Sequence, residues 1–179
     1  MTAVDNIMIE RIKLLHPDIR NEDLEIYKYI NNKLLGKNIR LRFSSTFRTD
    51  EEQKELYAKG RSIKGKKVTN AKPWQSIHNY GLALDIVILF DKDNNGVFET
   101  ASWNIKADND KDGKADWMEV VSYFKDSGWK WGGDWKSFPD YPHFEKTFGH
   151  TWKTLKAKID TGDFLTETIN DKIYKWVNL

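Results

Sequence analysis

The sequence contains no cysteine among its 179 residues, so it can form neither a disulfide bond nor a thiolate metal site. Histidine is also scarce, and the four histidines are His16, His78, His143 and His150. Any transition-metal site must therefore combine a few imidazoles with carboxylates. No segment is apolar over the length that spans a bilayer, which argues against membrane insertion. The N-terminal segment carries acidic residues and lacks a continuous apolar core, so we expect synthesis in the cytoplasm without a signal peptide.

The charges nearly balance, with 29 Lys and Arg residues against 27 Asp and Glu residues and a net charge of +2. This small excess does not provide the positive surface that nucleic-acid binding requires, so we expect no nucleic-acid partner. Hydrophobic residues make up 39% of the chain and aromatic residues 13%, which is enough for a core without covalent cross-links. The aromatic rings would also suit a groove for sugars or peptides. For a chain of this length we expect one main domain and a monomer.

Hydrophobic periodicity and capping signals predict three helices and three strands. The helices are expected at residues 21–36, 49–58 and 117–125, and the strands at residues 39–43, 83–90 and 143–145. Asn21 is the expected cap of the first helix, and Thr49 with Glu52 forms a capping box for the second. Because helices and strands intermix without regular βαβ alternation, we expect an α+β fold with a small, mainly antiparallel sheet flanked by helices.

Three residues have the chemistry of a hydrolytic zinc site, which uses three protein ligands and one open position. His78 and Asp85 are seven residues apart, too far along one helix to share an ion comfortably. They can converge if His78 lies in a loop, Gly81 bends the chain and Asp85 lies in the following strand. His143 is the candidate third ligand, and Asp140 is a suitable general base for a water molecule at the metal. Taken singly, each of these residues is as readily explained by a structural role.

The motifs around these residues resemble those of the M15 zinc peptidases, the clan of D-alanyl-D-alanine carboxypeptidases and dipeptidases. SIHNYGLALDI is similar to the signature S-x-H-x-x-G-x-A-x-D. WKWGGDWKSFPDYPHFE resembles the second signature of the L-alanyl-D-glutamate endopeptidase branch, known from phage endolysins. SSTFRTDEEQKELYAKGR resembles the first block of the family. The three blocks occur in the family order and cover roughly residues 40–149.

The resemblance implies a set of roles for individual residues. Zinc would be held by His78, Asp85 and His143 at the sheet, and Asp140 would be the catalytic base. Arg48 matches the arginine that steadies the scissile carbonyl as negative charge develops on it. Ser76 and Gln53 match motif positions for which we expect a supporting role around the metal or the substrate.

The resemblance also implies a domain division and an activity. Residues 1–149 would form the zinc peptidase domain, with an insertion at residues 91–119, and residues 150–179 a C-terminal extension packed on the same domain. We expect a bacteriolytic hydrolase, a metallopeptidase of the endolysin kind, that cuts the L-Ala–D-Glu bond of peptidoglycan stem peptides. It would reach the cell wall by holin-type or non-classical release. The alternatives are a D,D-carboxypeptidase or dipeptidase, and a non-catalytic wall-binding module with a structural zinc.

The polar insertion contains DNDKDGKADWME at residues 108–119, which satisfies the calcium-loop pattern of EF-hands. The predicted calcium ligands are Asp108, Asp110, Asp112, the Lys114 carbonyl and Glu119, with Asp116 at the ninth position. A solvated acidic loop that caps the next helix is the alternative, and a calcium-dependent interaction protein is a further one. The earlier segment 91–102 begins in the same way but has Ser102 at the twelfth position, so a tight turn is the expectation there.

Overall fold

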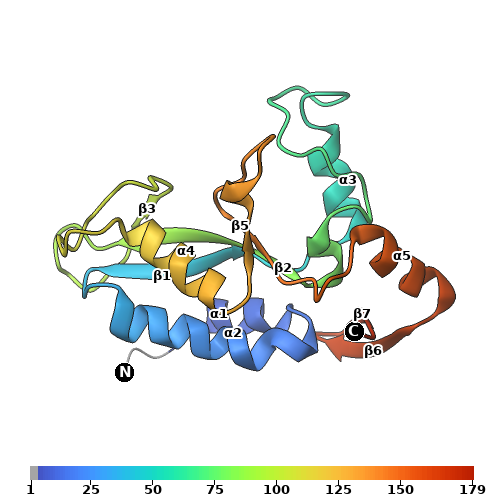
Figure 1. Ribbon diagram of the computed structural model, residues 1–179, viewed down its shortest axis with the longest axis horizontal. Helices are drawn as coiled ribbons and strands as arrows, with labels where there is room; N and C mark the ends of the chain where they lie inside the picture. Colours follow the sequence, from blue (N-terminus) through green and yellow to red (C-terminus); the bar gives the residue numbers. More distant parts are fainter. Residues whose placement is uncertain (1–3) are drawn as a thin grey trace.

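The computed structural model describes residues 4–179 and has an α+β architecture, which confirms the predicted fold class (Figure 1). The central antiparallel sheet has the strand order β1-β2-β5-β4, with β3 also paired to β2. Its strands are β1 (Ile39–Ser45), β2 (Ala83–Phe90), β3 (Thr100–Ser102), β4 (Lys130–Trp131) and β5 (His143–Glu145). A separate antiparallel hairpin consists of β6 (Phe164–Ile169) and β7 (Lys172–Val177).

Five α-helices and three short helical turns surround these strands in the part of the chain that the structure describes. The α-helices are α1 (Asn6–Lys13), α2 (Pro17–Tyr29), α3 (Asp50–Ala58), α4 (Asp116–Asp126) and α5 (Trp152–Thr161). The short turns are η1 (Ile30–Leu34), η2 (Ile77–Tyr80) and η3 (Gly132–Asp134). Helices α1 and α2 run along one side of the sheet, whereas α3 and the loop that follows it stand away on the other side (Figure 1).

Alternate side chains along β2 point to the core face of the sheet and to the opposite face, here called the open face, where Ala83, Val87 and Leu89 are also buried and Asp85 is partly exposed. Leu84, Ile86 and Ile88 are at most 2% exposed and belong to the hydrophobic core with residues of α1, α2 and α4. Burying each of them contributes roughly 1.5–3 kcal/mol. Since successive side chains of a strand point to opposite faces, Asp85 lies on the face away from this core. The open face is therefore where β2 can present functional groups.

The predicted elements agree with the structure except at the first helix. Strands β2 and β5 have the predicted bounds, and the capping box of Thr49 and Glu52 begins α3. The first helix was predicted to begin after Asn21, but α2 begins at Pro17. The fixed backbone angle of Pro17 suits the first helical turn, and the His16 Nδ1 atom accepts a hydrogen bond from the Asp18 backbone N–H at 3.3 Å. His16 thus caps α2 and is buried, at 3% exposure.

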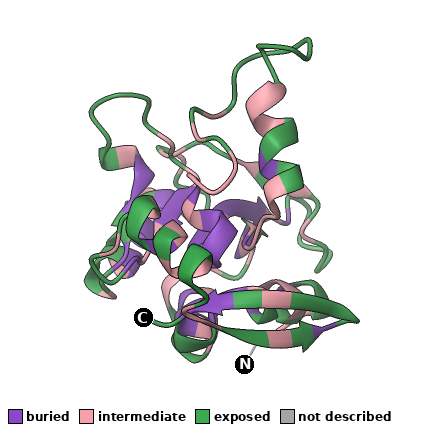
Figure 2. Cartoon of the chain, turned by 90° about the vertical axis from the view of Figure 1, so that its right-hand side faces the viewer, coloured by how far each residue is buried: buried purple, intermediate pink, exposed green. Residues whose placement is uncertain are grey.

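The C-terminal residues, for which the sequence showed no clear period, fold as α5 and the β6–β7 hairpin. Trp176 of β7 is 1% exposed, and its indole lies under the guanidinium of Arg20, 5.2 Å from the ring centroid. Arg20 also forms two hydrogen bonds to the Glu167 carboxylate, at 2.9 and 2.6 Å. The hairpin therefore packs on the N-terminal helices, although many of its outward residues are exposed (Figure 2).

The insertion between β2 and α4 is anchored to the sheet by β3. Strand β3 pairs with the second half of β2, from Ile88 to Phe90, whereas β5 pairs with its first half, from Ala83 to Asp85. Both strands therefore share one edge of β2, one after the other (Figure 1). None of the helices among residues 4–179 is long and apolar enough to cross a membrane.

Candidate metal centre

Two of the predicted ligands face each other across neighbouring strands. Asp85 of β2 is paired in register with His143 of β5 on one side and with Ser45 of β1 on the other. The register of β1 shifts between Phe43 and Ser45, so the chain bulges directly beside Asp85. Bulges of this kind often lie next to functional sites because they change the direction of a side chain. The sheet thus positions an imidazole and a carboxylate on its open face.

His78 reaches the same point from η2, the short turn that precedes β2. Gly81 ends this turn with φ of +69°, a left-handed conformation that glycine adopts at little cost. The His78 Nδ1 atom lies 2.6 Å from the Thr46 carbonyl oxygen, which fixes the ring orientation. As predicted from the loop-and-strand argument, the bend at Gly81 brings His78 and Asp85 together, although seven residues separate them.

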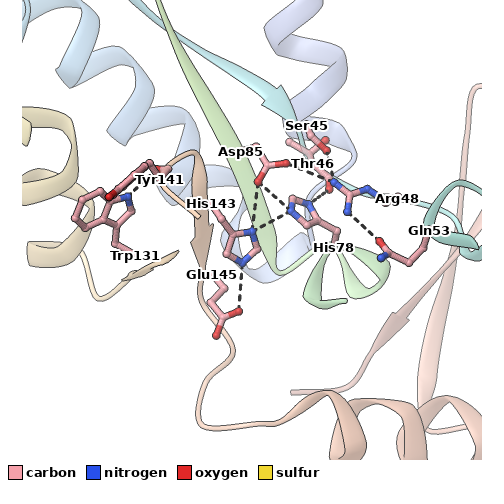
Figure 3. Close-up of polar contacts among 10 residues, drawn as sticks. All are labelled: Ser45, Thr46, Arg48, Gln53, His78, Asp85, Trp131, Tyr141, His143 and Glu145. Atoms are coloured by element: carbon pink, nitrogen blue, oxygen red, sulfur yellow. Dashed lines mark hydrogen bonds and ion pairs between the residues drawn. The ribbon is translucent and has the colours of Figure 1, made fainter. Parts of the chain in front are cut away.

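Three ligand atoms form a nearly equilateral triangle (Figure 3). The His78 Nε2 atom lies 3.2 Å from His143 Nδ1 and 3.2 Å from Asp85 Oδ1. The His143 Nδ1 atom lies 3.3 Å from the same Asp85 oxygen. All three residues are largely withdrawn from solvent, with side-chain exposures of 3%, 8% and 19% for His78, His143 and Asp85.

The hydrogen-bond partners of the two imidazoles indicate which nitrogens carry protons. The Thr46 carbonyl can only accept, so His78 donates to it from Nδ1 and leaves a lone pair on Nε2. The Glu145 carboxylate lies 3.3 Å from His143 Nε2, so His143 donates there and leaves a lone pair on Nδ1. Two lone pairs and a carboxylate oxygen then face one another. Three acceptors at this distance repel unless a proton or a metal cation lies among them.

The charges of the site shift the pKa values of its members in opposite directions. Burial would raise the pKa of Asp85, but the charges of His78 and His143 and their hydrogen bonds hold it far below its ordinary value. Burial would lower the pKa of His143, but hydrogen bonds and charge from Asp85 and Glu145 raise it to about 9. In a protein free of metal, a proton on His143 therefore supplies the positive charge that the acceptors require.

The triangle lies on the wall of a cleft with a volume of about 510 Å³, which Arg48, Ser76 and Asp140 also line. Burial raises the pKa of the Asp140 carboxyl, and the negative charge of Asp85 raises it further, against the opposing charges of the histidines and Arg48. The backbone N–H of Asp140 donates to the Gly132 carbonyl at 3.0 Å. Asp140 thus faces the same open space as the three ligand atoms.

Arg48 connects the candidate ligand Asp85 to a buried amide. One of its terminal nitrogens lies 3.4 Å from Asp85 Oδ2, and the other donates to Gln53 Oε1 at 2.9 Å. Gln53 is fully buried and donates in turn to the Ala71 carbonyl at 2.7 Å, which ties α3 to the loop that follows it and that also lines the cleft. Ser76 lies at the start of η2 and is 8% exposed.

The acidic loop at residues 108–119 has several hydrogen bonds of a folded cation-binding turn. The Gly113 N–H donates to Asp108 Oδ2 at 3.1 Å, and the Asp112 N–H donates to Asp110 Oδ1 at 3.3 Å. Oxygens of Asp108, Asp110 and Asp116 lie within 4.8 Å of one another.

Two of the predicted carboxylate ligands of calcium, Asp112 and Glu119, lie outside that group of close oxygens. Glu119 instead contacts the Lys114 ammonium at 3.5 Å, and this ammonium lies 3.7 Å from Asp112. In the earlier segment, for which a tight turn was expected, Asp91 accepts hydrogen bonds from the Asn95 and Gly96 N–H groups. One of its oxygens also lies within 4.8 Å of oxygens of Asp93 and Glu99. The sequence pattern of this segment included Asp91 and Asp93 but not Glu99.

Sequence reasoning missed two partners of the metal centre itself. Glu145 follows His143 by two residues in β5, and residues at this spacing share a face of a strand, so the alternation was a usable signal. The Thr46 carbonyl had no signal, because any residue type offers a backbone oxygen.

Comparison with known proteins finds a family model that matches the part of the chain containing SIHNYGLALDI and WKWGGDWKSFPDYPHFE. Residues 69–146 match the M15 peptidase family model described as D-alanyl-D-alanine carboxypeptidase. The peptidoglycan L-alanyl-D-glutamate endopeptidase CwlK of Bacillus subtilis (strain 168) is 46% identical over 110 residues, which are 62% of this chain and 62% of CwlK. The chain therefore matches about three fifths of the length of that relative.

Among solved structures, the crystal structure of the Serratia marcescens L-Ala D-Glu endopeptidase ChiX resembles this chain with a TM-score of 0.49 and 23% sequence identity. That match covers 81% of this chain and 90% of ChiX. The family match includes His78, Asp85 and His143 as well as Asp140. Over this region, the chain is therefore similar to the M15 peptidases.

Proposed function

We propose that this protein is a zinc metallopeptidase that hydrolyses the L-Ala–D-Glu bond in the stem peptides of peptidoglycan. The observation that carries the proposal is the triangle of three acceptor atoms from His78, Asp85 and His143 on the wall of an open cleft. The choice of bond is supported by the 46% identity to CwlK, whose name states that activity.

The donor set fits zinc in both chemistry and spacing. Zinc takes nitrogen and oxygen ligands at about 2.0–2.2 Å in tetrahedral geometry, which separates the ligand atoms by roughly 3.3–3.6 Å. Of the three separations, the one of 3.3 Å matches the lower limit of this range and the two of 3.2 Å lie just below it. Two histidines and one carboxylate are also a ligand set that leaves a fourth position open toward the cleft. Glu145 and the Thr46 carbonyl would orient the two imidazoles by accepting their other N–H groups.

The chemistry that a bound zinc supplies here is Lewis acidity, toward the scissile carbonyl and toward a water molecule. Asp140 takes the proton of the attacking water and passes it to the leaving amine, and its raised pKa brings it closer to the pH at which such transfer is efficient. Arg48 directs its guanidinium to the carbonyl oxygen as negative charge develops there. Gln53 holds that guanidinium through the hydrogen bond at 2.9 Å.

The description of the matched family, D-alanyl-D-alanine carboxypeptidase, supports a second candidate activity in the same cleft. Digestion of purified peptidoglycan, followed by mass spectrometry of the fragments, separates the two. Release of stems that begin with D-Glu supports the endopeptidase, whereas loss of terminal D-Ala alone supports the carboxypeptidase. Zinc content with no cleavage of either bond would support a wall-binding module with a structural zinc.

We also propose that the loop at residues 108–119 binds calcium. Glu119 is 8% exposed, its Oε2 atom has no hydrogen-bond partner among the described residues, and burial with the charges of Asp112 and Asp110 raises its pKa. A divalent cation would satisfy this carboxylate, in place of the Lys114 ammonium that now contacts it. Calorimetric titration with calcium should give binding for the parent protein and at least tenfold weaker binding for Glu119→Gln. Equal affinities would contradict the assignment.

The partner implied by this function is the peptidoglycan stem peptide, and the place of action is the cell wall. We propose that the protein acts as a monomer, because the three ligand atoms, Asp140 and Arg48 all come from one chain. Sedimentation of the active enzyme at working concentration tests this point. The holin-type or non-classical release expected from the sequence remains a prediction for experiments in cells.

A further inference from the structure

The insertion at residues 91–119 contributes an exposed aromatic side chain to the cleft. Trp103 follows β3 directly, lines the cleft that holds His78, Asp85 and His143, and is 58% exposed. Exposing so large an apolar ring is unfavourable, whereas most other tryptophans, such as Trp117 and Trp129, are buried in the core. An indole left uncovered beside polar catalytic groups is typical of a surface that a ligand covers.

The strand register places Trp103 close to the ligand Asp85. Ser102, the last residue of β3, is paired with Ile88 of β2, and Trp103 is the next residue beyond this pairing. If the chain stays extended for one more residue, Trp103 lies opposite Val87. Val87 and Asp85 are two residues apart on β2 and therefore share the open face of the sheet. At about 3.3 Å per residue, this extended geometry would place the Trp103 backbone roughly 7 Å along the strand from Asp85. The insertion thus places an aromatic ring at a defined spacing from the metal centre.

That spacing matches the chemistry of one part of the proposed substrate. In peptidoglycan, the L-Ala residue of the stem is joined through a lactyl group to an amino sugar. The sugar therefore lies about two residue lengths, or roughly 7 Å, from the carbonyl of the L-Ala–D-Glu bond. The side chains next to that bond are a methyl group and a carboxylate, and neither covers an indole. The apolar C–H face of a sugar ring does.

We infer that Trp103 is a substrate-binding residue that stacks on the amino sugar carrying the stem peptide. The inference rests on the proposed L-Ala–D-Glu activity and extends it, because the enzyme would then recognise the glycan as well as the peptide. For cleavage at the terminal D-Ala, the sugar would lie at least four residues, or roughly 13 Å or more, from the reacting carbonyl. Trp103 could not then meet the sugar.

The test compares a disaccharide–tetrapeptide with the same tetrapeptide lacking sugar, using zinc-loaded protein. For Trp103→Ala acting on the disaccharide–tetrapeptide, we expect KM to rise about tenfold and kcat to change less than twofold. On the free tetrapeptide, the rise in KM should be at least fivefold smaller. Trp103→Phe should keep most of the affinity for the sugar-bearing substrate. Phe148→Ala, which removes an aromatic ring that is 51% exposed outside the cleft, is the matched control.

A second measurement does not depend on turnover. Calorimetry at low temperature and over a short time measures the binding of the disaccharide–tetrapeptide to zinc-loaded protein. Parent affinity about tenfold above that of Trp103→Ala supports the inference even if no bond is cut, in which case only the proposed activity fails. Equal losses on both substrates, or no loss on either, would overturn the sugar contact. Cleavage confined to the terminal D-Ala would overturn it as well.

Discussion

At the scale of single residues, the metal centre depends on which nitrogens keep their protons. Thr46 and Glu145 each accept an imidazole N–H, and this leaves two lone pairs and one Asp85 oxygen facing each other. Glu145 therefore acts through His143, as an orienting group that also increases the basicity of the ring.

The role of Glu145 predicts the behaviour of Glu145→Gln. A neutral amide accepts a weaker hydrogen bond from His143 Nε2, so we expect zinc affinity to fall by about 10–100-fold while the fold is retained. Competition with a chromogenic chelator measures the affinity. Glu25→Gln, at an exposed position, is the control and should bind zinc as the parent does. Unchanged affinity in Glu145→Gln would show that the contact at 3.3 Å has no effect on the metal.

Asp140 predicts a separable loss of catalysis. Asp140→Asn keeps the three ligand residues but cannot accept a proton, so kcat/KM should fall by roughly 10²–10⁴-fold with zinc content unchanged. Because burial and Asp85 raise the pKa of Asp140, activity of the parent should be lost as pH falls through that raised pKa, where the base becomes protonated. The residual activity of Asp140→Asn should lack this acid limb. A variant with full activity would remove Asp140 from the mechanism.

At the scale of elements, the turn η2 that carries His78 is supported from the far end of the chain. A Cβ atom on Gly81 would lie 2.7 Å from a ring carbon of Trp176 and 2.9 Å from the His16 nitrogen. Trp176 of β7 and the cap of α2 therefore enclose the turn, and the His16 N–H donates to the Gly81 carbonyl at 2.9 Å. The C-terminal hairpin thus helps to position the turn that carries His78, a proposed metal ligand.

This packing predicts a large effect for Gly81→Ala. The left-handed backbone costs an alanine about 1–2 kcal/mol, and the overlap with Trp176 and His16 adds about 1–3 kcal/mol. Gly149→Ala is the matched control, since Gly149 has φ of +83° but no atom within 4 Å of an added Cβ, so only the backbone cost applies. Urea unfolding of both variants measures the difference. If Gly81→Ala and Gly149→Ala lost the same free energy of unfolding, the turn at Gly81 would adjust without displacing the hairpin.

At the scale of the whole molecule, one buried carboxyl makes stability depend on pH. Asp23 of α2 is fully buried, and neither of its oxygens has a hydrogen-bond partner among residues 4–179. Burial raises the pKa of Asp23 well above its ordinary value, and the charge of Glu22 adds to this, against the charge of Lys146. Because the pKa is higher in the folded state, ionisation favours the unfolded chain as pH rises above about 4.

Asp23→Asn should therefore raise the free energy of unfolding at pH 8 by about 1–3 kcal/mol, and this gain should shrink toward pH 4, where the parent carboxyl is protonated in both states. Urea unfolding at the two pH values measures it, with the exposed Asp126→Asn as control. A gain of equal size at both pH values would show that ionisation of Asp23 is not its cause.

The sequence by itself determined the set of ligand candidates and about half of the regular elements, namely three of the five α-helices and three of the seven strands among residues 4–179. The apolar, β-branched run ALDIVILF predicts β2, the Thr49 and Glu52 pair begins α3, and the absence of cysteine restricts metal chemistry to histidine and carboxylate. These features are local, because they depend on residues within a few positions of one another. The start of α2 was missed even so, because an imidazole as helix cap is an uncommon signal.

Only the tertiary structure decided which distant groups meet. The pairing of Glu145 with His143, the enclosure of Gly81 by Trp176, and the shared edge of β2 that brings Trp103 beside the metal centre all depend on strand register and packing. Such contacts join residues far apart in the chain, and many sequence positions could supply an equivalent carbonyl or ring. The ligand types follow from local chemistry, whereas the geometry that makes them one site follows from how β1, β2 and β5 pair.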